Sequence, residues 1–158
     1  MKAASIKQIK DELQQLTPGD LVNICLRLSK FKKENKELIT YLLFDAGNEG
    51  GYVDEVKNTL ASEFESVNTK SPYIAKKNLR RIIRLGNRFI KYSDDPETPV
   101  QVLLFICKEM NRLPLNFTRS ASLVNIVTST RNKLLKHIEI LHEDLQYEYK
   151  KEFQKLND

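Results

Sequence analysis

The feature that most constrains the fold of this 158-residue sequence is its hydrophobic spacing: apolar residues recur at steps of three and four in every long segment. Such spacing places them on one face of an α-helix, whereas a half-buried strand would alternate at every second residue. No stretch shows sustained period-two alternation between turn residues. We therefore predict an all-α fold of about seven helices. Six are expected at about 4–16, 18–31, 52–67, 72–92, 99–112 and 119–156, and the third along the chain contains Leu38, Leu42 and Leu43.

Proline marks the expected helix starts. A hydroxyl residue precedes a proline at three of them: Thr17-Pro18, Ser71-Pro72 and Thr98-Pro99. The hydroxyl can accept a bond from an unpaired N–H of the first turn, and proline fits the first helical position because it has no N–H to leave unpaired. Gln101 completes the spacing of a capping box with Thr98.

Length and composition indicate one compact helical domain over residues 1–158. The chain is 41% hydrophobic and 30% charged, which is typical of a globular protein. It has neither the roughly 18-residue apolar run of a membrane span nor the apolar segment of a signal peptide. Cys25 and Cys107 lie among aliphatic residues and are expected to be buried, reduced thiols. We expect a cytoplasmic protein.

Two parts of the chain resemble each other. Leu21, Ile24 and Phe31 match residues 58 positions later, and the segment 41–44 resembles 102–105. A second interpretation of the fold is therefore two stacked three-helix units, as in a short helical-repeat array.

The last predicted helix, about 119–156, is long for a domain of this size. Unbroken it would reach roughly 55 Å, against a domain diameter of about 40 Å. It must bend, with 126–130 as the candidate point, or project from the domain. A projecting end would expose Tyr149, Phe153 and Leu156 and favour a homodimer through this helix; the alternative is a tail folded back on the first two helices.

Positive charge is concentrated on one helix, 72–92. Eight of the 26 basic residues and none of the 21 acidic residues lie between Glu65 and Asp94, so the rest of the chain has a net charge of −3. The helical spacing puts apolar residues on one side. On the other side it puts seven cations: Lys76, Lys77, Arg80, Arg81, Arg84, Arg88 and Lys91.

We interpret this face as a binding site for a polyanion, most readily nucleic-acid backbone, because arginine suits bidentate phosphate contacts. A second acid-free window, from Glu109 to Glu139, supplies a secondary basic patch. Its members are Arg119, Arg131, Lys133 and Lys136. If the two windows are adjacent, a groove results.

Three other interpretations of the basic face remain open. The cations could dock an acidic protein partner, which would make the chain a helical adaptor. They could also be neutralised by acids of the helix 52–67 or of the last helix, leaving no binding site. Membrane-surface binding is disfavoured, because the apolar side of this helix is needed for the core and has no Trp.

Catalytic, cofactor and metal sites are not expected. Glu139 and His142 have the Glu-x-x-His spacing of di-iron bundles, but the second motif is missing. The glycine-rich stretch 46–52 has no Lys-Ser/Thr pair and follows no predicted strand, so it is a turn and not a phosphate-binding loop. We therefore predict a non-enzymatic binding protein.

Overall fold

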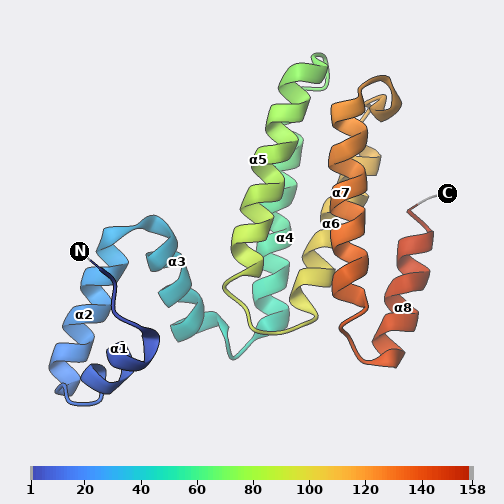
Figure 1. Ribbon diagram of the computed structural model, residues 1–158. Helices are drawn as coiled ribbons and strands as arrows, with labels where there is room; N and C mark the ends of the chain where they lie inside the picture. The colour runs from blue at the N-terminus through green and yellow to red at the C-terminus, as the bar shows by residue number, and fades with distance from the viewer. Residues whose placement is uncertain (1, 157–158) are drawn as a thin grey trace. The chain divides into compact units, whose positions relative to one another are not determined.

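The computed structural model describes residues 2–156, except for the side chain of Arg119, and its regular structure over these residues is helical throughout (Figure 1). This confirms the predicted all-α class. The elements are α1 (Ile6–Leu13), α2 (Pro18–Phe31), α3 (Lys33–Thr40), a π-helical turn (Tyr41–Asp45), α4 (Glu49–Glu65), α5 (Pro72–Ile90), α6 (Thr98–Arg112), a 3-10 turn (Phe117–Arg119), α7 (Ala121–Ile138) and α8 (Glu143–Gln154).

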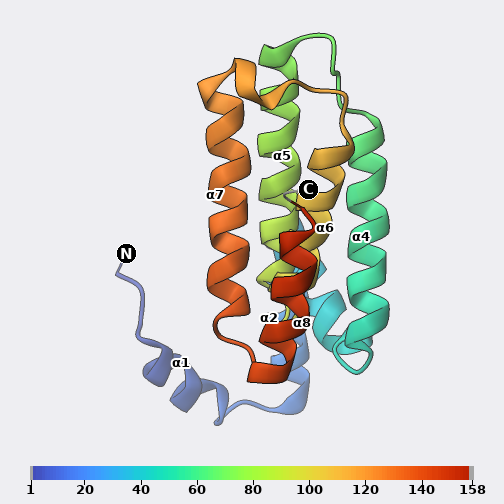
Figure 2. The ribbon, with the colours of Figure 1, turned by 90° about the vertical axis from the view of Figure 1, so that its right-hand side faces the viewer.

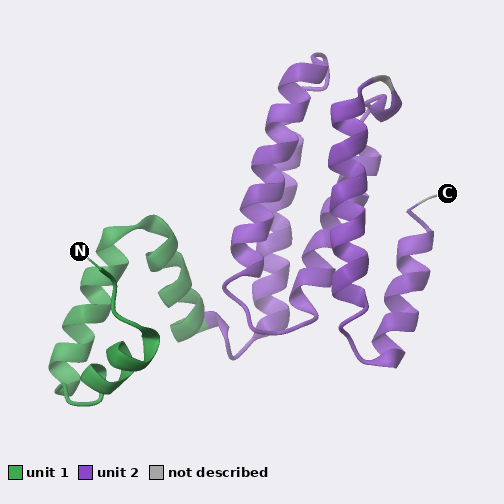
Figure 3. Cartoon of the chain, viewed as in Figure 1, with its two compact units in different colours: residues 1–44 green, residues 45–158 purple. Residues whose placement is uncertain are grey.

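The backbone contacts divide the chain into two compact units, residues 1–44 and residues 45–158 (Figure 3). We call them unit 1 and unit 2 and describe each by itself. The single domain over 1–158, like the stacked-repeat alternative, stays a prediction.

Unit 1 contains α1, α2 and α3. Ser5 caps α1 in a reciprocal capping box with Gln8, and Thr17 caps α2 as predicted, accepting from the N–H of Asp20 at 3.2 Å. The apolar residues of unit 1 are largely exposed: Ile6 is 82% exposed and Phe31 is 76% exposed. Three helices of this length provide too little inner surface to enclose their own apolar faces. Helix α2 buries no residue, and Cys25 on it is exposed. The expectation that Cys25 is buried is therefore wrong.

Unit 2 contains the hydrophobic core. Helices α4 to α7 form an up-and-down bundle, in which α5 and α7 run in the same direction, and α8 packs against α7 (Figures 1 and 2). The core is built from the apolar faces of these helices, with Leu60, Leu79, Ile82 and Leu103 fully buried. Gly86 lies where α5 approaches α4 and α6, since a Cβ there would be 2.7 Å from Cδ1 of Ile106.

The start of α6 differs from the prediction. Thr98 does not cap the helix but is its first residue, and its buried hydroxyl donates to Oε1 of Glu49 on α4. Gln101 instead donates its side-chain amide to Oε1 of Glu97 at 3.1 Å. A carboxylate from another helix therefore replaces the predicted capping box.

The predicted long helix is two helices, α7 and α8, and the chain reverses at residues 139–142 and not at 126–130. His142 accepts from the N–H of Asp144 at the start of α8. The side-chain amide of Gln146 donates to the carbonyl oxygens of Glu139 and Leu141 at 3.2 and 2.9 Å. These bonds satisfy carbonyl groups that the end of α7 leaves without helical partners.

Helix α8 folds back on α7 and α6. Nδ2 of Asn111 donates to the carbonyl oxygen of Leu156 at 2.8 Å, and Lys108 pairs with Glu152 at 2.7 Å. Leu156 is buried, and Tyr149 and Phe153 are half-buried. The residues on which the expectation of a homodimer rests thus pack within unit 2, and dimerisation itself stays a prediction.

Candidate nucleic-acid interface

Helix α5 carries the predicted basic face. Ser71 caps it by accepting from the N–H of Ile74 at 3.4 Å, and Pro72 takes the first helical position, as the sequence predicts. Its inner side is buried through Ala75, Leu79, Ile82, Gly86 and Ile90. Because this stripe is fixed against α4 and α6, the cations on the opposite side are held toward the solvent.

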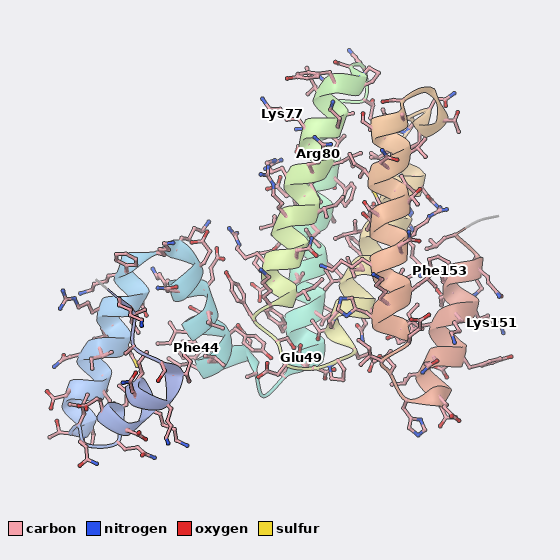
Figure 4. All side chains as sticks on the ribbon, viewed as in Figure 1. Phe44, Glu49, Lys77, Arg80, Lys151 and Phe153 are labelled. Atoms are coloured by element: carbon pink, nitrogen blue, oxygen red, sulfur yellow. The ribbon has the colours of Figure 1, made fainter. Side chains whose placement is uncertain are left out.

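A groove of about 600 Å³ runs along residues 73–84 of α5 beside α7. It is lined by Tyr73, Lys76, Lys77, Arg80, Ile83, Arg84, Ser129 and Thr130. Lys77 and Arg80 project from this part of α5 in Figure 4. Nε of Arg84 donates to the carbonyl oxygen of Arg80 at 3.3 Å, which holds the Arg84 guanidinium along the helix surface. We call this site the α5–α7 groove.

The four cations of the α5–α7 groove are not neutralised within residues 2–156: Lys76, Lys77, Arg80 and Arg84 form no ion pair with a described carboxylate. Two of the acids on the helices proposed to cover the face have other partners. Asp54 pairs with Lys57 at 3.6 Å, and Glu152 pairs with Lys108 and Lys155. Positive charges four residues apart repel each other on a helix, so the groove retains an unfavourable interaction that a bound anion would relieve.

The other three predicted cations of α5 lie outside the lining of the groove. Arg81 forms an ion pair with Glu63 of α4, as the structural interpretation of the face anticipates. Arg88 is half-buried, with its guanidinium carbon 5.6 Å from the centre of the Phe89 ring. Lys91 is exposed just beyond the end of the helix. The seven cations therefore do not form one uniform stripe, and the groove cations, which form no ion pair with a described carboxylate, lie within residues 76–84 of α5.

Two members of the secondary basic patch, Arg131 and Lys133, form hydrogen bonds within unit 2. Nη2 of Arg131 donates to Oδ1 of Asn111 at 3.1 Å and to the carbonyl oxygen of Leu156 at 3.0 Å, so this side chain ties Leu156 to the bundle. Lys133 donates to Oδ1 of Asn87, and burial together with the nearby charge of Lys91 lowers its pKa. Lys136 is exposed. The side chain of Arg119 lies outside the described residues.

The acid-free window after Glu109 does contribute to the groove, but through uncharged residues that were not predicted. Ser129 and Thr130 line its α7 wall, and both hydroxyls donate to the carbonyl oxygen of Ile126, at 3.1 and 2.8 Å. The only sequence signal is the hydroxyl run 128–130 in a segment without acids. Tyr73, also not predicted, is 67% exposed and lines the α5 side.

Helix ends add to the positive potential. The N-termini of α5 and α7 lie at the same end of the bundle (Figures 1 and 2), and neither helix has an acidic residue in its first turn. A helix N-terminus favours negative charge, and natural helices often supply it with Asp or Glu. The first turns of α5 and α7 therefore contain no acidic side chain that would balance the positive end of the helix.

Cys107 and the Glu-x-x-His motif lie outside the lining of the α5–α7 groove. Burial raises the pKa of the Cys107 thiol to about 12, which keeps it protonated and unreactive. In the Glu-x-x-His motif, Nδ1 of His142 lies 3.4 Å from Oδ2 of Asp144, at the start of α8. In the part of the chain that the structure describes, no cluster of three or more metal-ligating side chains occurs.

The comparisons with known proteins give no relative: no protein-family model, no curated protein and no solved structure matches this chain. None of the helices within residues 2–156 combines the length and apolar character needed to cross a bilayer.

Proposed function

We propose that this protein is a non-enzymatic polyanion-binding protein that holds nucleic-acid backbone in the α5–α7 groove. The observation that carries the proposal is the set of four groove cations without an ion-pair partner among the described residues. Lys77, Arg80 and Arg84 contact phosphate, and Lys76 adds charge at the rim.

Electrostatics supports this assignment over a solvated helix face. Cations on an ordinary surface helix are interspersed with acids, whose i,i+4 pairs stabilise the helix. Here 28 consecutive residues, 66–93, contain eight cations and no acid. Backbone contacts of this kind carry no sequence information, so the expected binding depends little on base sequence and strongly on salt.

The salt dependence of binding tests the proposal. Four neutralised phosphates, three in contact with Lys77, Arg80 and Arg84 and one facing Lys76 at the rim, predict a slope of about −3 for a single strand when the logarithm of the association constant is plotted against the logarithm of salt concentration. That is a roughly 50-fold loss of affinity between about 50 mM and about 200 mM salt. Arg80→Gln with Arg84→Gln should reduce the slope to about −1.5.

The matched control is Lys150→Gln with Lys151→Gln on α8, which removes the same net charge from exposed lysines (Figure 4 labels Lys151). The control should keep the original slope. Equal losses in both variants would assign the binding to net charge rather than to the groove. Absence of binding to any nucleic acid at low salt would overturn the proposal, and capture of an acidic protein that the α5 variant fails to retain would then favour the adaptor function.

A further inference from the structure

The α5–α7 groove contains more than a phosphate site requires. Besides its cations it presents the Tyr73 side chain, 67% exposed, and the apolar side chain of Ile83. A duplex turns its phosphates outward and keeps its bases stacked on each other, so it offers a helix face only charge and groove edges. An aromatic ring and an aliphatic surface in the same groove suit unpaired bases, whose flat faces are accessible.

Tyr73 is held in a defined position. The Lys76 ammonium lies 5.4 Å from the centre of its ring, within the range of a cation–π contact. An exposure of 67% is too large for both ring faces to be covered. One face is therefore fixed by Lys76, and the remaining exposed surface is available for stacking.

Tyr73 is also aligned with the phosphate-binding cations. Tyr73, Lys77, Arg80 and Arg84 are separated by four, three and four residues and lie along one stripe of α5. At the helical rise this stripe extends about 16 Å. A nucleotide chain lying along it can place a base against the ring while the following phosphates meet the cations.

We infer that the α5–α7 groove selects single-stranded over double-stranded nucleic acid, by stacking an unpaired base on Tyr73 while Lys77, Arg80 and Arg84 hold the backbone. The combination of a cationic track with an exposed aromatic side chain is the usual basis of sequence-tolerant single-strand binding. This selectivity rests on the proposed function, since it requires that the groove bind nucleic acid at all.

Introduced tryptophan provides a direct probe, because the chain contains none. Tyr73→Trp should bind a single-stranded oligothymidylate of about 12 nucleotides with quenching of the tryptophan fluorescence, as expected for stacking. Tyr147→Trp is the matched control: Tyr147 is 72% exposed on α8, away from the groove lining. Its fluorescence should stay unchanged on binding.

Affinities measured on the otherwise unchanged full chain complete the test. Tyr73→Ala should weaken single-strand binding about tenfold, whereas Tyr73→Phe should leave it within about twofold, because the ring and not the hydroxyl does the stacking. A hairpin duplex of equal charge should bind more weakly than the single strand and should not respond to Tyr73→Ala.

The two proposals fail in different ways. Equal single-strand and duplex affinity, with no effect of Tyr73→Ala but a reduced salt slope in the Arg80→Gln, Arg84→Gln variant, would overturn strand selection and leave phosphate binding standing. No binding of either nucleic acid would overturn both. Quenching in Tyr147→Trp equal to that in Tyr73→Trp would also refute stacking at the groove.

Discussion

Replacing Gly86 by alanine tests the helix packing that orients the basic face. Gly86 lies on the buried side of α5, and a Cβ at this position would meet Cδ1 of Ile106 at 2.7 Å and methyl carbons of Leu60 and Val102 at 3.6 Å. The two longer distances are ordinary contacts, but carbon atoms prefer about 3.5–4.0 Å. Ile106 must therefore retreat by about 0.8 Å, and its side chain is fully buried.

Two opposing effects set the magnitude. Overpacking a closed core costs about 1–3 kcal/mol, while alanine is favoured over glycine inside a helix by about 1 kcal/mol. We expect a net destabilisation of about 1 kcal/mol for Gly86→Ala. Gly50→Ala in α4 is the control: a Cβ there meets nothing within 4 Å, so only the propensity gain applies and the protein should become more stable.

A double-mutant cycle isolates the clash. Ile106→Val removes the obstructing Cδ1 and alone should cost about 0.5–1.5 kcal/mol. In the Gly86→Ala, Ile106→Val double variant the new methyl group occupies the vacated space, so the free energy of unfolding should exceed the additive value by about 1 kcal/mol or more. Urea unfolding followed by far-ultraviolet circular dichroism measures all four proteins. Additivity within about 0.3 kcal/mol, or a Gly86→Ala protein as stabilised as the Gly50→Ala control, would refute the close approach of α5 and α6.

The remaining predictions concern titratable groups. A disulfide reagent should modify one thiol, Cys25, in the folded protein and both after denaturation, because Cys107 is buried with a pKa near 12. Burial and the charge of Lys133 lower the pKa of His137, so protonation of this side chain opposes folding. The free energy of unfolding should therefore fall as pH drops through the ordinary histidine range. In His137→Gln, a plot of the free energy of unfolding against pH should be flatter in that range. Hydrogen bonds from two lysines lower the pKa of Glu152 to about 2, so its contribution to stability is present at neutral pH and is lost as pH falls below about 4.5. Glu152→Gln should therefore lose less stability in that pH window, by a small margin because water screens a side chain that is 37% exposed.

The sequence by itself determined the helices and the concentration of charge. The signals for both are local, and each can be recognised within a few helical turns of sequence. They are the spacing of apolar residues by three and four, a hydroxyl before proline at Thr17 and Ser71, and the acid-free segment around α5. Local signals also placed the cations opposite the buried side of α5. They succeed because helical geometry fixes the side on which each residue lies before any tertiary contact forms.

Tertiary structure alone decided which of those cations border the α5–α7 groove. Arg81 pairs with Glu63, and Arg131 bonds to the carbonyl oxygen of Leu156. Arg80 and Arg84 instead border a groove that is completed by Ser129 and Thr130, from a helix about 50 residues away. The reversal between α7 and α8 is a similar case, since bonds from Gln146 satisfy the carbonyls that the break exposes. Periodicity along one segment carries no information about which other segment packs against it. The packing of the helices decides which segments become neighbours, which charges pair and what shape the groove has.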